Sequence, residues 1–139
     1  MKFKMRTLHF SPAGNAEKIA QAIARAQACT SDQIPPAYPI ENEKLTFVIA
    51  ELKSSSANKS VLNLLRDLTP ARTKNVAICA IGSNFAGVAE MKQIISSKGI
   101  DVAGVQECTV KGGLFKKAAV SEADIKSAVD WAGKIVDAL

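Results

Sequence analysis

Residues 11–16, with the sequence SPAGNA, form the segment of this chain that is best suited to chemistry. They lie between a strand-like segment and a helical one, so they make a strand-to-helix loop. The first backbone N–H groups of a helix have no partners within it, and the helix dipole favours an anion there. Gly14 permits a tight turn, and Ser11 and Asn15 can add side-chain donors. The loop is a candidate phosphate site, although a plain turn without a ligand is the alternative, because Gly-Asn pairs favour turns by conformation alone.

Strand-like and helical segments alternate along the chain on both sides of this loop. Apolar runs predict strands at residues 3–10, 30–34, 45–52, 75–81 and 100–110. Helical periodicity predicts helices at residues 15–29, 58–68, 86–98 and 121–139. Gly99 is a typical helix stop, and the Ser121-Glu122-Ala123-Asp124 segment resembles a capping box at the start of the last helix. Prolines make residues 34–39 an extended connection.

This alternation predicts the architecture that positions the loop. Runs such as FVIA and VAICAI are apolar on both faces, which is typical of parallel strands covered by helices. The sequence therefore predicts a single α/β domain over residues 1–139, an open three-layer sandwich with a five-stranded parallel sheet in the order 2-1-3-4-5. Ligands of such sheets lie outside the carboxyl ends of the strands. Residues 11–16, 52–57, 82–87 and 111–116 are therefore the loops expected to form a site.

Two segments carry a resemblance to the flavodoxins that extends along the whole chain. HFSPAGNAEKIA is similar to their FMN-phosphate loop, Ser/Thr-x-Thr-Gly-Asn-Thr, and IGSNFAGVAEMKQIISSKGIDVAG is similar to their fourth-strand loop and the following helix. The resemblance implies a flavodoxin-like fold, FMN as cofactor, electron transfer as activity, and Phe85 beside the isoalloxazine ring. The cofactor contacts that it implies are Ser11, Pro12, Ala13, Gly14, Asn15, Ala16, Lys53, Ser54, Gly82, Ser83, Asn84, Phe85 and Gly87.

Three features depart from the flavodoxin pattern. Ala13 and Ala16 stand where the family loop has threonines, which removes two hydroxyl donors from the phosphate site. The third-strand loop, Glu51-Leu52-Lys53-Ser54-Ser55-Ser56, lacks the family's Pro-x-Tyr/Trp-x-Gly pattern and offers no aromatic platform, although Lys53 could favour an anionic reduced flavin. The chain has a formal net charge of +5, whereas flavodoxins are acidic, so it would need different electron-transfer partners.

Composition narrows the class of protein further. The 139 residues, 47% hydrophobic and 22% charged, fit one globular domain, and without a signal-like or membrane-spanning segment we expect a cytoplasmic location and no membrane partner. The basic residues are scattered apart from Lys111, Lys116 and Lys117, so we expect no nucleic-acid binding. The widely spaced Cys29, Cys79 and Cys108 and the lone His9 predict no metal site. We expect Cys79 to pack in the core, Cys108 to lack activation, and Trp131 to pack within the last helix.

Other functions of similar folds do not fit the loops. A response-regulator receiver needs acidic residues after the first and third strands, where this chain has His-Phe-Ser and Ala-Glu-Leu. A low-molecular-weight phosphatase needs a cysteine in the first loop, and a dinucleotide site needs GxGxxG there. The glycine loop Lys111-Gly112-Gly113-Leu114-Phe115 could approach a ring edge, but a simple turn is the favoured interpretation.

Two hypotheses follow from the sequence. The first is an FMN-binding electron carrier with a redox protein as partner, in which the cofactor performs the chemistry and no side chain acts as acid or base. A self-standing enzyme is less favoured, because the chain has little spare length for a nicotinamide nucleotide site. The second is a degenerate flavodoxin-like domain that has lost FMN and serves as a non-catalytic binding module. The two alanines, the missing aromatic residue and the basic charge favour the second.

Overall fold

Five parallel strands form the centre of the computed structural model, which describes residues 2–110 and 118–139. The strands are β1 (Met5–Phe10), β2 (Thr30–Gln33), β3 (Glu43–Leu52), β4 (Thr73–Gly82) and β5 (Asp101–Thr109). They are arranged in the order β2-β1-β3-β4-β5, and every neighbouring pair is parallel. The predicted fold class and strand order are therefore confirmed.

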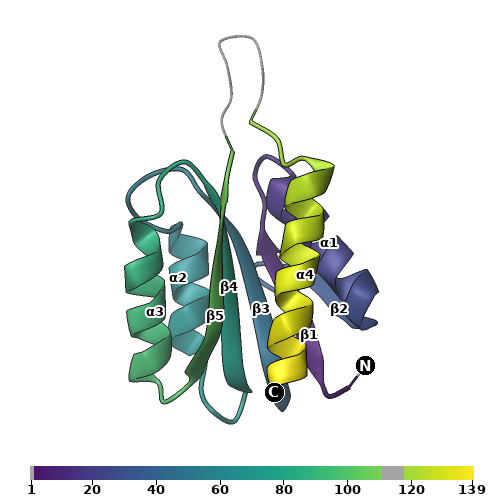
Figure 1. The fold of residues 1–139 in the computed structure, drawn as a ribbon. Helices are drawn as coiled ribbons and strands as arrows, with labels where there is room; N and C mark the ends of the chain where they lie inside the picture. The colour runs from purple at the N-terminus through teal and green to yellow at the C-terminus, as the bar shows by residue number, and fades with distance from the viewer. Residues whose placement is uncertain (1, 111–117) are drawn as a thin grey trace.

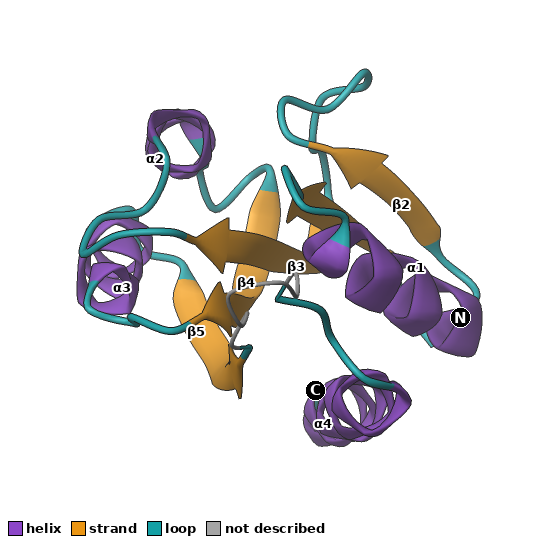
Figure 2. Cartoon of the chain, turned by 90° about the horizontal axis from the view of Figure 1, so that it is seen from above, coloured by secondary structure: helices purple, strands orange, loops and turns teal. Residues whose placement is uncertain are grey.

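Helices cover both faces of this sheet, as Figures 1 and 2 show. The helices are α1 (Asn15–Gln27), α2 (Lys59–Asp67), α3 (Gly87–Ser97) and α4 (Glu122–Ala138). Helices α1 and α4 lie on one face, and α2 and α3 lie on the other. The result is the expected three-layer sandwich with two apolar interfaces.

Strand β3 contributes side chains to both interfaces. Phe47 and Ile49 pack into the cluster beneath α1 and α4, whereas Val48 and Ala50 pack into the cluster beneath α2 and α3. Successive side chains of a strand point to opposite faces, so a strand covered on both sides must be apolar at nearly every position. The continuous apolar run in the sequence has this structural cause.

Local signals at the helix ends act as the sequence predicts. Ser121 and Asp124 form a capping box at the start of α4, and Gly14 before α1 and Gly99 after α3 have φ values of 88° and 78°. Such positive values favour glycine. The ring of Trp131 packs edge-on against Phe47, with ring centroids 5.9 Å apart, so this side chain is part of the core.

Strands β3 and β4 each begin two residues earlier than the sequence predicts, at Glu43 and Thr73. Both polar side chains are buried at that end of the sheet: Arg6 donates to the Glu43 carboxylate at 3.0 Å, and Thr46 donates to the Thr73 hydroxyl at 3.0 Å. Contacts with residues on other strands therefore extend β3 and β4 beyond the starts that the hydrophobic pattern predicts.

Registers at the opposite edge bring the candidate loops together. Phe10 pairs with Ala50, and Leu52 pairs with Gly82. The loops that follow β1, β3 and β4 therefore leave the sheet side by side at its carboxyl edge. This edge is where ligands bind in open α/β sheets.

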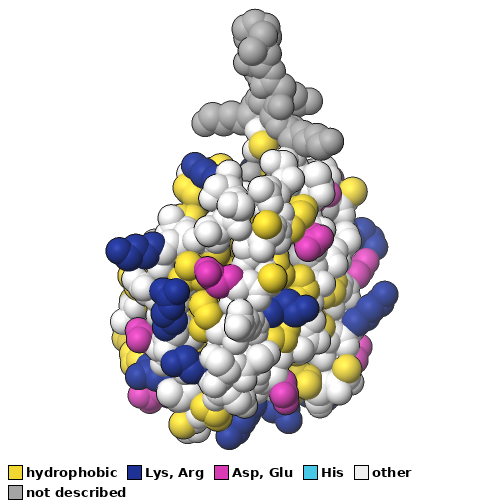
Figure 3. Space-filling view, turned by 90° about the vertical axis from the view of Figure 1, so that its left-hand side faces the viewer, with side chains coloured by type: hydrophobic (Ala, Val, Ile, Leu, Met, Phe, Trp, Pro, Cys, Tyr) yellow, Lys and Arg dark blue, Asp and Glu magenta, His cyan; other side chains and the backbone are white. Residues whose placement is uncertain are grey.

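Positively and negatively charged side chains are mixed on one face of the molecule. On the face seen in Figure 3, Lys and Arg side chains are interspersed with Asp, Glu and hydrophobic side chains.

Within the described part of the chain, no helix is both long and apolar enough to cross a bilayer. The glycine loop Lys111-Gly112-Gly113-Leu114-Phe115 and the basic group Lys111, Lys116 and Lys117 lie outside the described residues.

Candidate functional site

A cavity of about 410 Å³ lies at the carboxyl edge, between the ends of the first, third and fourth strands. It brings together residues that are distant in sequence, including Pro12, Ala13, Asn15, Lys53, Gly82 and Ser83 of the predicted set. Glu51, Leu52, Ile81, Val110 and Ala118 complete its lining. The strand order and register thus assemble the predicted loops after β1, β3 and β4 around one space, whereas the fourth predicted loop, residues 111–116, lies outside the described residues.

The loop between β1 and α1 has the geometry of an anion-binding turn. The Gly14 N–H donates to the Ser11 carbonyl at 3.2 Å and closes the turn. Gly14 then adopts a left-handed conformation and precedes the first residue of α1. The N–H groups of Ala13, Asn15 and Ala16 converge on one point, where they bind a single carboxylate.

That carboxylate belongs to Glu51, near the end of β3. Its Oε2 accepts hydrogen bonds from the Ser11 hydroxyl at 2.8 Å, the Asn15 N–H at 3.0 Å and the Ala16 N–H at 3.1 Å. Its Oε1 accepts a fourth from the Ala13 N–H at 2.9 Å, and the residue is only 6% exposed. A buried carboxylate is costly unless it is fully hydrogen-bonded, and this one is satisfied by the donors that the sequence analysis assigned to a phosphate.

The side chain of Asn15 also has partners within the protein. Its amide nitrogen donates to the Ala118 carbonyl at 3.0 Å, and its amide oxygen accepts from the Val120 N–H at 3.1 Å. These bonds fix the segment that leads into α4 against the first loop. The predicted side-chain donor of Asn15 is therefore used within the chain.

The loop after β4 is shaped by internal packing. The Asn84 side chain accepts from the Ala86 N–H at 3.0 Å, which stabilises the turn into α3. A Cβ atom on Gly82 would lie 2.4 Å from the Leu52 carbonyl oxygen, and one on Gly87 would lie 2.7 Å from the Ala57 nitrogen. Gly82 therefore permits close contact with the last residue of β3, and Gly87 permits close contact with the segment that follows β3. Packing within the chain is therefore enough to explain why both predicted site positions are glycine, without a ligand.

Phe85, the predicted ring partner, is half-buried and packs against the apolar cluster beneath α2 and α3. Within the described part of the chain, it does not line the 410 Å³ cavity. Lys53 and Ser54 are exposed, and both line a second, smaller cavity of about 280 Å³ that shares Glu51 and Pro12 with the first. The carboxyl edge therefore offers a lysine, several serines and backbone groups, while Phe85 packs against the apolar cluster beneath α2 and α3.

Cys108 lies one residue before the carboxyl end of β5, and therefore close to this edge of the sheet. It is buried, and burial together with the charge of Asp124 raises the pKa of its thiol to about 11. A thiol with a raised pKa stays protonated near neutral pH and is a poor nucleophile. Among the described residues, the surroundings of Cys108 therefore disfavour its thiolate. Cys79 is fully buried, with its pKa raised to about 12 by burial, and is a core residue as predicted.

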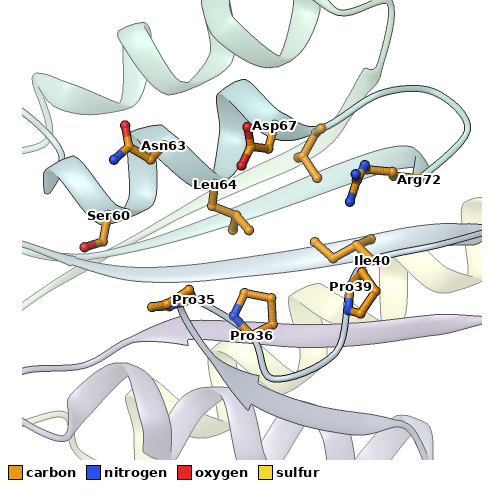
Figure 4. Close-up of a pocket in the computed structure, with 10 residues that line it drawn as sticks. Pro35, Pro36, Pro39, Ile40, Ser60, Asn63, Leu64, Asp67 and Arg72 are labelled. Atoms are coloured by element: carbon orange, nitrogen blue, oxygen red, sulfur yellow. The ribbon is translucent and has the colours of Figure 1, made fainter.

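A separate groove of about 270 Å³ lies between α2 and the connection from β2 to β3. Figure 4 shows Pro35, Pro36 and Pro39 facing Leu64 and Ser60 across it. Asp67 and Arg72 lie toward one end. None of the residues predicted to bind a cofactor lines this groove.

Glu51 is the residue that the sequence analysis missed. It was noted only as part of a loop without an aromatic residue, yet the signal was present: one acidic side chain interrupts an apolar run at the end of a buried strand. A charged group there needs partners. In the predicted strand order, the neighbouring strand is β1, whose following loop offers unpaired N–H groups.

Comparisons with known proteins identify the fold. No family model matches the sequence, and a search of curated proteins finds no match. Solved structures match along nearly the whole chain. Oxidised flavodoxin 1 from Bacillus cereus superposes with a TM-score of 0.75 at 16% identity, covering 98% of this chain and 99% of that one. The two-electron reduced flavodoxin of Megasphaera elsdenii matches with a TM-score of 0.66 at 15% identity, covering 94% and 98%. The chain therefore has a flavodoxin-like fold.

Proposed function

We propose that this chain is a flavodoxin-like domain that works without FMN, as a non-catalytic binding module. The observation that carries the proposal is the Glu51 carboxylate in the first loop, bound by three backbone N–H groups and the Ser11 hydroxyl. An electron carrier of this fold would need those donors for the phosphate of its cofactor. Here they serve the folded chain itself.

The residues of the first loop do not fit an FMN phosphate while Glu51 is in place. A phosphate would have to displace the carboxylate from contacts of 2.8–3.1 Å, and each hydrogen bond to a charged group is worth roughly 1.5–3 kcal/mol. Two negative groups about 4 Å apart near a protein surface repel by about 4 kcal/mol. A penalty of that size weakens binding by roughly a thousandfold.

The residues that would face the flavin ring give independent support for the proposal that FMN does not bind. The segment after β3 carries Lys53, Ser54 and further serines where an aromatic platform would be needed. Phe85 packs against the α2 and α3 side. Flavin rings gain affinity from aromatic stacking, and the described residues provide no such surface in this cavity.

An FMN-binding electron carrier is the second candidate. The flavodoxin-like fold and the 410 Å³ cavity at the carboxyl edge favour it. In that case a redox protein would be the partner, and the basic chain would select an acidic one. Glu51 would have to leave the first loop before FMN could bind.

A flavin titration separates the two candidates. The purified protein is titrated with FMN and, in parallel, with riboflavin, which has the same ring but no phosphate, and quenching of flavin fluorescence is measured. We expect no saturable binding of either ligand up to about 100 μM, which corresponds to a binding free energy weaker than about −5.5 kcal/mol. The protein should also be colourless after purification.

Saturable FMN binding in the low micromolar range would overturn the proposal in favour of the electron carrier. The riboflavin arm then reports whether the phosphate contributes. FMN binding that is much tighter than riboflavin binding would place the phosphate in the first loop, whereas equal affinities would mean that the ring alone is held.

A further inference from the structure

We propose that this chain forms a symmetric dimer in which Tyr38 of each copy inserts into a groove of the other. The groove has a volume of about 270 Å³ and lies between α2 and the connection from β2 to β3. We call it the proline groove, after Pro35, Pro36 and Pro39 in its wall. None of the described residues that line it lines the two cavities at the carboxyl edge. The inference therefore goes beyond the proposed function and does not depend on Glu51.

Tyr38 is the most exposed large apolar side chain in the described part of the chain, with 76% of its surface open to solvent. Its carbonyl oxygen accepts from the Arg6 guanidinium at 3.1 Å, and the neighbouring Ala37 N–H donates to the Asp32 carboxylate at 2.8 Å. Pro39 restricts the backbone on the other side. A side chain on a segment held in this way loses little conformational entropy on binding, and tyrosine is enriched among the residues that dominate interface affinity.

The proline groove has the composition of a receptor for an aromatic ring. Figure 4 shows its prolines on one side and Leu64 of α2 on the other. Ile40 and Leu68 also line it and are almost fully buried, so its inner surface is apolar. Proline-rich segments and aromatic side chains pack against one another in peptide recognition. The 270 Å³ volume lies just below the range of roughly 300–1,000 Å³ for ligand pockets, so it suits one side chain better than a cofactor.

The groove and the tyrosine lie side by side on one surface. Tyr38 belongs to the connection that forms the groove wall, between Pro36 and Pro39, but its side chain does not line the groove of its own chain. A two-fold dimer joins the same patch of both subunits, so that patch must be complementary to itself. A patch that carries both an aromatic side chain and an apolar receptor for one meets this requirement.

The charges of the patch favour a second copy as the occupant. Asp67 and Arg72 both line the groove, and Figure 4 shows them toward one end of it. Both are exposed, and neither forms an ion pair within the described residues. Across a two-fold axis, Asp67 of each copy pairs with Arg72 of the other. Complementary charges select the partner and fix the register of an interface, and here one chain supplies both signs.

Sedimentation velocity of the full chain at about 5–500 μM tests the dimer. We expect the mass to rise from that of one chain to that of two, with a dissociation constant of about 1–100 μM, because a patch of this kind lies at the small end of protein interfaces. Tyr38→Ser should weaken the association by at least about a hundredfold, since each dimer loses two inserted rings. The position is exposed, so this variant should keep the circular dichroism spectrum and melting temperature of the wild type.

Charge variants test the predicted pairing across the two-fold axis. Arg72→Glu and Asp67→Lys each place like charges opposite one another, so each variant should associate with itself at least about tenfold more weakly than the wild type. An equimolar mixture of the two variants should form a mixed dimer, because both pairs then join opposite charges. The double variant should recover for the same reason. Arg66→Glu makes the same charge change on an exposed residue of α2 that does not line the groove and should associate as the wild type does.

Methyl NMR spectra show whether the groove is the surface that becomes covered. The Leu64 and Ile40 methyl resonances should shift with protein concentration in the wild type and remain unchanged in Tyr38→Ser. A wild-type protein that stays monomeric up to about 500 μM would overturn the inference. Dimerisation of Tyr38→Ser at wild-type affinity, or a mixture of the two charge variants that associates no better than either alone, would also overturn it. A monomer whose Leu64 methyl responds to another molecule would assign the groove to a different occupant and contradict the dimer.

Discussion

Strand β3 begins with a buried glutamate, Glu43, and carries a second, Glu51, one residue before its end, and the two are stabilised in different ways. Glu43, at the amino edge, is 2% exposed and pairs with the Arg6 guanidinium at 3.0 Å and with the Lys4 ammonium at 3.9 Å. Its Oε2 has no hydrogen-bond partner among the described residues. Glu51, at the carboxyl edge, binds only uncharged donors, and both of its oxygens are satisfied.

The difference follows from the direction of the helices. In a sheet of parallel strands the covering helices run in the opposite direction, so their C-termini lie at the amino edge and their N-termini lie at the carboxyl edge. Helix C-termini carry partial negative charge and N-termini carry partial positive charge. A carboxylate at the amino edge therefore needs cations, whereas one at the carboxyl edge can be held by N–H groups alone.

The largest expected effect comes from Glu51→Gln. The amide cannot accept from all four donors and places its own N–H groups against theirs, so we expect the free energy of unfolding to fall by about 3 kcal/mol. Urea denaturation followed by circular dichroism measures it. The matched change Glu17→Gln, on an exposed residue of the same helix, should cost less than about 0.5 kcal/mol. Equal losses in the two variants would contradict the role given to the Glu51 contacts.

Glu43→Gln should cost less, about 1–2 kcal/mol, because one of its oxygens has no partner to lose and the partly accessible Arg6 can turn toward water. A double-mutant cycle with Arg6→Met measures the coupling, which we expect to be about 1 kcal/mol. The same cycle with Lys4→Met should give a coupling near zero, since that ammonium is 3.9 Å away on a side chain that is 53% exposed. Equal couplings for Arg6 and Lys4 would mean that Glu43 is stabilised by positive charge in general and not by its short contact with Arg6.

The smallest effect concerns Cys29, beside the amino edge. Burial raises the pKa of its thiol to about 11, and the negative charge of Glu43 contributes in the same direction. Glu43→Gln should therefore lower this pKa, increase the thiolate fraction at pH 9 and speed alkylation of Cys29 by a few-fold. Peptide mass spectrometry after timed iodoacetamide treatment measures the rate. Glu51→Gln serves as the control, and acceleration by that variant would mean local unfolding rather than an electrostatic effect.

The sequence predicts the fold well because each element has a local signal. Apolar runs such as VAICAI mark strands buried on both faces, and Gly99 and the Ser121 capping box mark helix ends that the structure reproduces. Two polar strand ends were missed, because Glu43 and Thr73 belong to their strands only through partners on other segments. Local patterns cannot show such partners.

Local sequence predicts where the first loop turns into a helix, but it does not predict the group that the loop's donors bind. The turn at Gly14 and the start of α1 are local features, so the sequence indicates both. The occupant, Glu51, is 35–40 residues away from its donors, and its contacts depend on the register between two strands. The packing of Phe85 against the cluster beneath α2 and α3 also depends on the path of its loop, which local patterns do not give.

A crystal structure of the wild-type protein grown from concentrated ammonium sulfate tests the central claim most directly. The account predicts the Glu51 carboxylate within hydrogen-bond distance of the N–H groups of Ala13, Asn15 and Ala16, with no sulfate between them. A sulfate bound by those N–H groups, with Glu51 turned toward solvent, would contradict it.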